Sequence, residues 1–247
     1  MAGPDVVDDS LQAKLHYFWK SLWQDKANSF HEDSVLRDPN PVDGVDVPAT
    51  VKVLRLSKIF PFIGDVMIRD DYDEALRDID AYHTEGDRNS VIISGHSGIG
   101  IIMGSVGQAF TYIYSTLSRQ DYPIVLILVK RLLEEKPTIL QNNTQYLIFF
   151  HTNGVTLLNP CRSVDPESEE YQKTWALVDI NLHVKTPAEM LGCPFFLVMA
   201  SSPWASRLRK LQKYRRPAAY WLMKSFTLAE LTKRQWFWPA FCLLSLM

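Results

Sequence analysis

"VIISGHSGIG", residues 91–100, is the stretch of sequence that decides the fold. It begins with three β-branched apolar residues, and Ser94 and Gly95 end this run. A short apolar run stopped by glycine is typical of a strand that is buried on both faces of a parallel sheet. Gly98 and Gly100 follow, and glycine lets a chain turn sharply without steric cost. The stretch therefore predicts a buried strand that leads into a glycine-rich loop.

Segments with helical and strand periodicity alternate on both sides of this stretch. Apolar residues at helical spacing predict amphipathic helices over 11–23, 69–84 and 121–137. Short apolar runs predict strands over 51–57, 138–141, 174–181 and 194–203. Two further runs around Asn153-Gly154 predict a hairpin over 146–158. The alternation predicts an α/β fold: a mainly parallel sheet flanked by helices, with an N-terminal helix and loop ahead of it.

The composition is that of a globular protein. With 247 residues, of which 47% are hydrophobic, the chain can bury a sizeable core, and we expect one domain with appended elements. The formal net charge of −2 gives no overall attraction to nucleic acid or to an anionic membrane. The run from Arg207 to Arg216 is locally basic. Two interpretations of it stay open, a solvated helix face or a contact for nucleic-acid phosphates.

The cysteines and the N-terminal residues bear on the cellular compartment. Cys161, Cys193 and Cys242 lie far apart and form no CxxC pair, so we expect reduced, buried thiols rather than a disulfide framework or a zinc site. Asp5 and Asp8 stand where a signal peptide would need a basic start and an apolar core. We therefore expect an intracellular protein, cytoplasmic or nuclear, without a signal peptide.

The glycine-rich loop has the glycine spacing of a phosphate-binding loop. In such a loop successive backbone N–H groups point at the phosphates, at the start of a helix whose dipole favours anions. The residues expected to bind a nucleotide in this way are Gly95, His96, Ser97, Gly98, Ile99 and Gly100. The pattern also requires Lys and then Ser or Thr after the last glycine, and the chain has Ile101 and Ile102 there. No lysine lies between Lys58 and Lys130, so a shifted register does not supply the missing cation.

A carboxylate near the end of another apolar run completes the pattern. Asp179 follows four apolar residues in the strand expected over 174–181, and the next expected strand ends in Ser-Ser-Pro. The aspartate that organises Mg²⁺ in phosphate-binding-loop proteins lies at the carboxyl end of such a buried strand. We therefore predict that Asp179 is the catalytic and metal-binding residue. The alternative is an ordinary aspartate at the end of a buried strand.

The order of these motifs resembles that of the fungal P-loop NTPase domains found in Crinkler-type and retrotransposon-hot-spot-type proteins, which belong with the AAA-like and STAND-like ATPases. The matching segments are "IRDDYDEAL" (68–76), "VIISGHSGIG" (91–100), "VLILVKRLLEEKPTILQ" (125–141), "YLIFF" (146–150) with "NGV" (153–155), "ALVDIN" (176–181), "FFLVMASSP" (195–203) and "YWLMKSFTLAEL" (220–231). The resemblance implies a P-loop NTPase fold, ATPase activity, and ATP and Mg²⁺ as cofactors.

The resemblance also assigns roles to residues of this chain. The glycines of the loop match those of the family's Walker A motif, and the motif is degenerate here because its Lys-Ser/Thr pair is missing. Asp179 matches the Walker B acid, and Ser201 or Ser202 matches the polar tip of the sensor strand. Ile180 stands where many relatives have a catalytic glutamate.

The resemblance and the composition divide the chain into segments. Residues 1–50 are expected to form an N-terminal helix and a linker, because Asp, Pro, Asn and Gly dominate residues 33–48. Residues 51–235 are expected to form the P-loop NTPase-like domain, and residues 236–247 an apolar C-terminal tail. Residues 101–120 are an anomalous apolar insertion, since the family's helix begins directly after the loop, and a retained intron in the gene model would explain it.

These observations favour a nucleotide-binding domain and leave a second function open. By resemblance the domain is an ATPase that is impaired as written, because the lysine is missing. The alternative is a non-catalytic interaction or regulatory module, with a protein partner or a second copy of the chain as its ligand.

A further alternative is membrane association through residues 91–117, which are long and apolar enough for a transmembrane helix. Glycines throughout this segment and the lack of flanking basic clusters argue against it, so we expect no membrane span.

Overall fold

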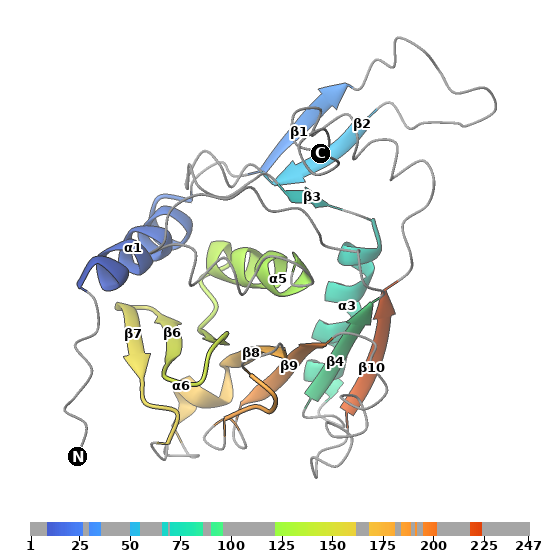
Figure 1. Cartoon of the computed structure of the whole chain (residues 1–247). Coiled ribbons are helices and arrows are strands. Elements are labelled where there is room, and N and C mark those ends of the chain that lie inside the picture. Colours follow the sequence, from blue (N-terminus) through green and yellow to red (C-terminus); the bar gives the residue numbers. More distant parts are fainter. Residues whose placement is uncertain are drawn as a thin grey trace, which may run out of the picture.

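The computed structural model describes residues 9–26, 30–35, 50–54, 66–68, 70–85, 90–95, 122–161, 168–180, 184–188, 191, 195–201 and 218–223. These residues form two sheets and several helices (Figure 1). The smaller sheet has three antiparallel strands in the order β1-β2-β3. Its strands are β1 (Phe30–Val35), β2 (Thr50–Leu54) and β3 (Val66–Ile68).

The larger sheet has seven strands in the order β10-β4-β9-β8-β5-β6-β7. Five neighbouring strands are parallel to one another: β10 (Ala218–Met223), β4 (Ser90–Gly95), β9 (Phe196–Ser201), β8 (Trp175–Ile180) and β5 (Thr138–Gln141). β6 (Leu147–His151) and β7 (Gly154–Leu158) extend the sheet in antiparallel fashion. The predicted α/β fold with a mainly parallel sheet is therefore confirmed, and the strands expected around 91–94, 138–141, 174–181 and 194–203 all belong to this sheet.

Among the described residues, helices cover the two faces of the large sheet unequally. α1 (Asp9–Trp19) with its π-helical continuation (Lys20–Gln24), α3 (Asp70–Glu85) and α5 (Tyr122–Leu133) share one hydrophobic core with one face, here called the α5 face. α6 (Glu169–Gln172) packs on the opposite face through Tyr171, and Figure 1 shows it on the side of the sheet away from α5. Successive strand residues alternate between the faces, as in any strand. In β8, Leu177 belongs to the α5-face core and Val178 to the other.

Trp175, the first residue of β8, fixes two helices to the α5 face. Its side chain is 1% exposed, and the Arg131 guanidinium of α5 lies over its ring at 4.1 Å from the centroid. The His83 ring of α3 meets it edge-on at 5.5 Å, and Phe196 of β9 lies at 5.1 Å. Burial, and next the positive charge of Arg131, lower the pKa of His83, so the neutral imidazole is the form that packs here.

The hairpin forms one residue earlier than the sequence predicts. His151 pairs with Gly154, so the two turn residues are Thr152 and Asn153, and Gly154 already belongs to β7. Gly154 has a φ of 132°, a conformation that side-chain-bearing residues rarely adopt. The backbone therefore requires this glycine at the start of the strand rather than in the turn.

Other expectations need correction. The expected linker over 33–48 is wrong for residues 33–35, which belong to β1 and pair with β2. The sequence reasoning did not predict β1, β3, α6 or β10 as elements. Cys161 is exposed and not buried as expected. The insertion at 101–120, the basic run 207–216, Cys193, Cys242 and the tail 236–247 lie outside the described residues.

The alternative of a transmembrane helix over residues 91–117 does not fit the fold. Residues 91–95 belong to β4, which pairs with β10 on one side and β9 on the other. The remaining residues of that segment lie outside the described ranges. Among the helices that the structure describes, none combines the length and the apolar character needed to cross a bilayer.

Candidate functional site

Three parallel strands bring polar residues to the carboxyl edge of the large sheet. Ser94 of β4 pairs with Ser201 of β9, which pairs in turn with Ile180 of β8. One residue earlier, Ile93, Ala200 and Asp179 form the neighbouring row. The end of the strand that leads into the glycine-rich loop thus lies in register with the strand that carries Asp179.

Asp179 is a buried carboxylate on the α5 face. Its side chain is 1% exposed, and it follows Leu177 by two residues, which places it on the same face. Ala200 lies between Asp179 and Ile93 in the row, so the two flanking positions are about 9–10 Å apart at the usual strand spacing. Carboxylates are seldom fully buried, because their desolvation is costly.

The connections of β4 and β9 leave in opposite directions along the sheet. The chain after β4 passes β9 and β8 to reach β5, whereas the chain after β9 passes β4 to reach β10. Right-handed crossovers that diverge in this way cover opposite faces of the sheet. At such a switch point a crevice opens outside the carboxyl ends of the two strands, and ligands of open α/β sheets bind there. Gly95, the last residue of β4, is therefore at the switch point.

Ser94 is a polar group at this edge that the sequence reasoning missed. It is 5% exposed, and within the described part of the chain its buried Oγ has no hydrogen-bond partner. A buried hydroxyl without a partner is costly, so a bound ligand or water is the natural way to satisfy it. The signal in the sequence was a hydroxyl residue after the apolar "VII", directly before Gly95.

Other buried polar groups beside this edge are engaged within the fold. The Gln141 side-chain carbonyl accepts a hydrogen bond from the Ala188 backbone N–H at 2.9 Å. The Asn143 side-chain oxygen accepts from the backbone N–H groups of Gln145 and Tyr146, at 2.8 and 3.0 Å. These two side chains organise the turn after β5 and the segment packed on the α6 face.

The predicted site residues fall into two groups. Gly95 and Ser201 end β4 and β9, and Asp179 is the fifth residue of β8, so all three lie at the same edge. The remaining predicted residues lie outside the described ranges, and they are His96, Ser97, Gly98, Ile99, Gly100 and Ser202.

The donor set at this edge fits a cation that is shared with a ligand. Across the described ranges, no three His, Cys, Asp or Glu side chains gather closely enough to hold a metal ion. Mg²⁺ does not need such a cage, since it is usually bound by one or two carboxylates, water and substrate phosphates. The buried Asp179 carboxylate on the α5 face is an oxygen ligand of the kind that Mg²⁺ prefers. Ser94 and Ser201 lie on the α6 face, because they follow Ile92 and Met199 of the other core by two residues.

Comparison of the sequence with protein-family models, and of the chain with curated proteins and solved structures, finds no match.

Proposed function

We propose that the chain is a nucleotide-binding module of the P-loop NTPase kind, which binds Mg·ATP weakly and does not turn it over. The observation that carries this proposal is the buried Asp179, held in register with the end of β4 at the switch point where the glycine-rich loop begins. The helix that follows the loop, α5, also lies on the face of the sheet that carries Asp179.

The glycine-rich loop and Asp179 have separate roles in this proposal. The backbone N–H groups that begin at Gly95 bind the phosphates, because consecutive amides at a glycine-rich turn form an anion-binding concavity. Asp179 holds the cation from the α5 face, directly or through water. The Ser94 and Ser201 hydroxyls lie on the α6 face at the same edge, so they take no part in holding it. When bound, Mg²⁺ would supply the positive charge that offsets the phosphates.

The absence of a Walker A lysine argues for binding without catalysis. Phosphoryl transfer depends almost entirely on positioning and on electrostatic stabilisation of the transition state. Ile101 and Ile102 replace the residues that would supply a cation and a hydroxyl. The same observation favours the second candidate function, an interaction or regulatory module that retains the α/β scaffold and uses no nucleotide at all.

We expect the chain to bind Mg·ATP with a dissociation constant weaker than about 100 µM, since the missing lysine contact is worth about ten- to a hundredfold in affinity. We also expect no ATP hydrolysis above background. Asp179→Asn keeps the size of the side chain and should weaken Mg·ATP binding at least about fivefold, with little effect on ATP in EDTA. Isothermal titration calorimetry measures both.

The matched control is Glu85→Gln, which removes an exposed carboxylate at the end of α3 and should leave Mg·ATP affinity unchanged. Equal binding by the Asp179→Asn variant, with its thermal unfolding intact, would remove Asp179 from the site. Micromolar binding by the original chain would contradict the predicted weakness.

A further inference from the structure

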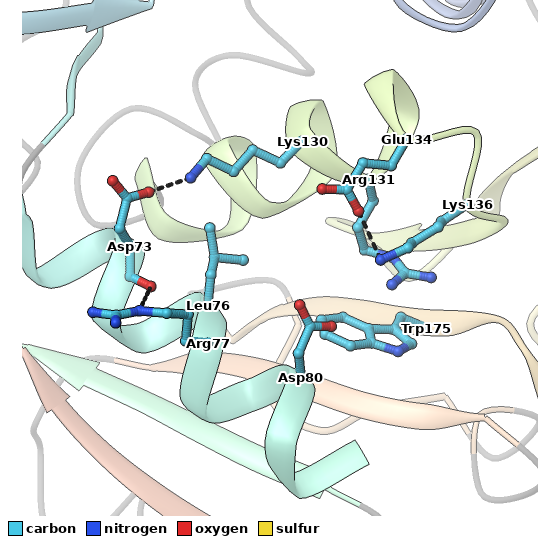
Figure 2. A pocket seen from close by; sticks show the side chains of 9 residues that line it. All are labelled: Asp73, Leu76, Arg77, Asp80, Lys130, Arg131, Glu134, Lys136 and Trp175. Atoms are coloured by element: carbon cyan, nitrogen blue, oxygen red, sulfur yellow. Dashed lines mark hydrogen bonds and ion pairs between the residues drawn. The ribbon is translucent and has the colours of Figure 1, made fainter. Parts of the chain in front are cut away.

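A cavity lies at the amino edge of the same sheet. It has a volume of about 280 Å³ and lies between α3 and α5, with Trp175 at its base (Figure 2). Trp175 is the first residue of β8 and Asp179 the fifth, so the two positions are about 13 Å apart along the strand. The cavity is therefore separate from the proposed nucleotide site.

The charges that line the cavity leave one positive charge in excess. Four basic and three acidic side chains line it, together with Leu76 and Trp175. Two of the acids are neutralised locally, Asp73 by an ion pair with Lys130 and Glu134 by one with Lys136 at 2.7 Å (Figure 2). The charged groups that remain are Arg77 and Asp80 on α3 and Arg131 on α5.

Arg131 is the buried cation of this cavity. It is 4% exposed, its Nε donates to Thr138 Oγ1 at 2.9 Å, and its Nη2 donates to the Pro137 carbonyl oxygen at 2.9 Å. Both acceptors are neutral, and no carboxylate of the described residues lies within ion-pair distance of it. A guanidinium has five N–H groups, so these bonds leave three of them for another acceptor.

The surroundings keep Arg131 charged without supplying a counter-ion. Burial lowers the pKa of Arg131 to about 9, against the opposing effects of Asp80 and Glu134, so the group stays protonated at neutral pH. A buried charge that lacks a partner is costly, and an anion bound against it recovers much of that cost. The cavity thus complements a negatively charged ligand.

We propose that this cavity binds a small monocarboxylate, whose carboxylate group faces the Arg131 guanidinium. A guanidinium presents its N–H groups as a planar fork that matches a carboxylate. The single excess positive charge suits a monoanion, and the Asp80 carboxylate disfavours a doubly charged phosphate. Arg131 already covers the Trp175 ring, so that face is not free to stack a nucleobase.

The test is a titration of the full chain with sodium butyrate, followed by the NMR signals of the Arg131 Nε–H and the Trp175 indole N–H. We expect a saturable shift with a dissociation constant of about 1–10 mM, as suits one small anion in a partly open cavity. Inorganic phosphate should bind at least about threefold more weakly. A shift that sodium chloride reproduces at equal ionic strength, or tighter binding of phosphate, would overturn the proposal.

Variants separate binding from a purely structural role. Arg131→Met keeps an unbranched chain over Trp175 and should abolish the butyrate response. Lys173→Met, which removes an exposed cation that does not line the cavity, is the control and should leave the affinity unchanged. If Arg131→Met does not fold, two other variants decide. Leu76→Phe fills the cavity and should abolish binding, and Asp80→Asn removes a repelling charge and should tighten binding about threefold. Unchanged or weaker binding by Asp80→Asn would contradict the proposal, because a purely structural Arg131 predicts no tightening.

Discussion

A chain in which Lys-Ser replaces residues 101–120, so that Gly100 continues through Lys-Ser into Asp121, should bind Mg·ATP about ten- to a hundredfold more tightly than the original chain. The new lysine restores a charge-assisted contact to phosphate worth about 1.5–3 kcal/mol. The shortening also brings the start of α5, at Tyr122, next to the loop, where a helix N-terminus favours anions. α5 already lies on the face of the sheet that carries Asp179, so the three parts of the site then adjoin.

Calorimetric titration of the shortened chain measures this gain. Its control changes the new lysine to alanine, which should return the affinity to that of the original chain. The shortened chain should also be more soluble, because it loses a long apolar segment. If it fails to fold while the full chain folds as a monomer, residues 101–120 are a genuine structural element, and the non-catalytic module becomes the better account.

Trp175→Ala should lower the free energy of unfolding by about 3–5 kcal/mol, the usual cost of removing a large buried aromatic side chain. The ring is 1% exposed and contacts Arg131, His83 and Phe196, so its loss leaves a cavity beneath α3 and α5 together. Since domains are typically stable by only about 5–15 kcal/mol, this variant should be close to unfolding at room temperature.

Urea unfolding followed by circular dichroism measures this loss. The control is Tyr17→Ala on α1, where the ring is 56% exposed and the change should stay within about 0.5 kcal/mol. A loss below about 1 kcal/mol for Trp175→Ala would contradict the packing of α3 and α5 on this end of β8.

Local sequence patterns predicted the elements whose own residues determine them. β4 and β8 are continuous apolar runs because both of their faces are covered, and α3 and α5 have apolar residues at helical spacing. β1 has the sequence "FHEDSV", which carries no strand pattern, and its pairing with β2 determines it. The position of β9 between β4 and β8 could not be predicted either, because strand order depends on contacts between residues far apart in the sequence.

The two candidate sites also differ in how far local sequence patterns predict them. The edge that holds Gly95, Asp179 and Ser201 was predictable, because the carboxyl ends of parallel strands share one edge of a sheet. The cavity around Arg131 depends on α3 and α5 lying side by side over Trp175, and no local pattern in either helix signals that arrangement. Ser94 was overlooked because a single hydroxyl in an apolar strand has no pattern of its own.

The most direct test of the proposed nucleotide site is an NMR titration of the labelled chain with ATP at millimolar concentration and Mn²⁺ in place of Mg²⁺. The paramagnetic ion broadens the signals of nearby amides most strongly. We predict selective broadening at Gly95, Ile180 and Ser201, little at Thr156 in the distant strand β7, and loss of the selective effect in the Asp179→Asn variant. Broadening confined to other surfaces, or unchanged by Asp179→Asn, would contradict the claim that a nucleotide binds at this edge of the sheet.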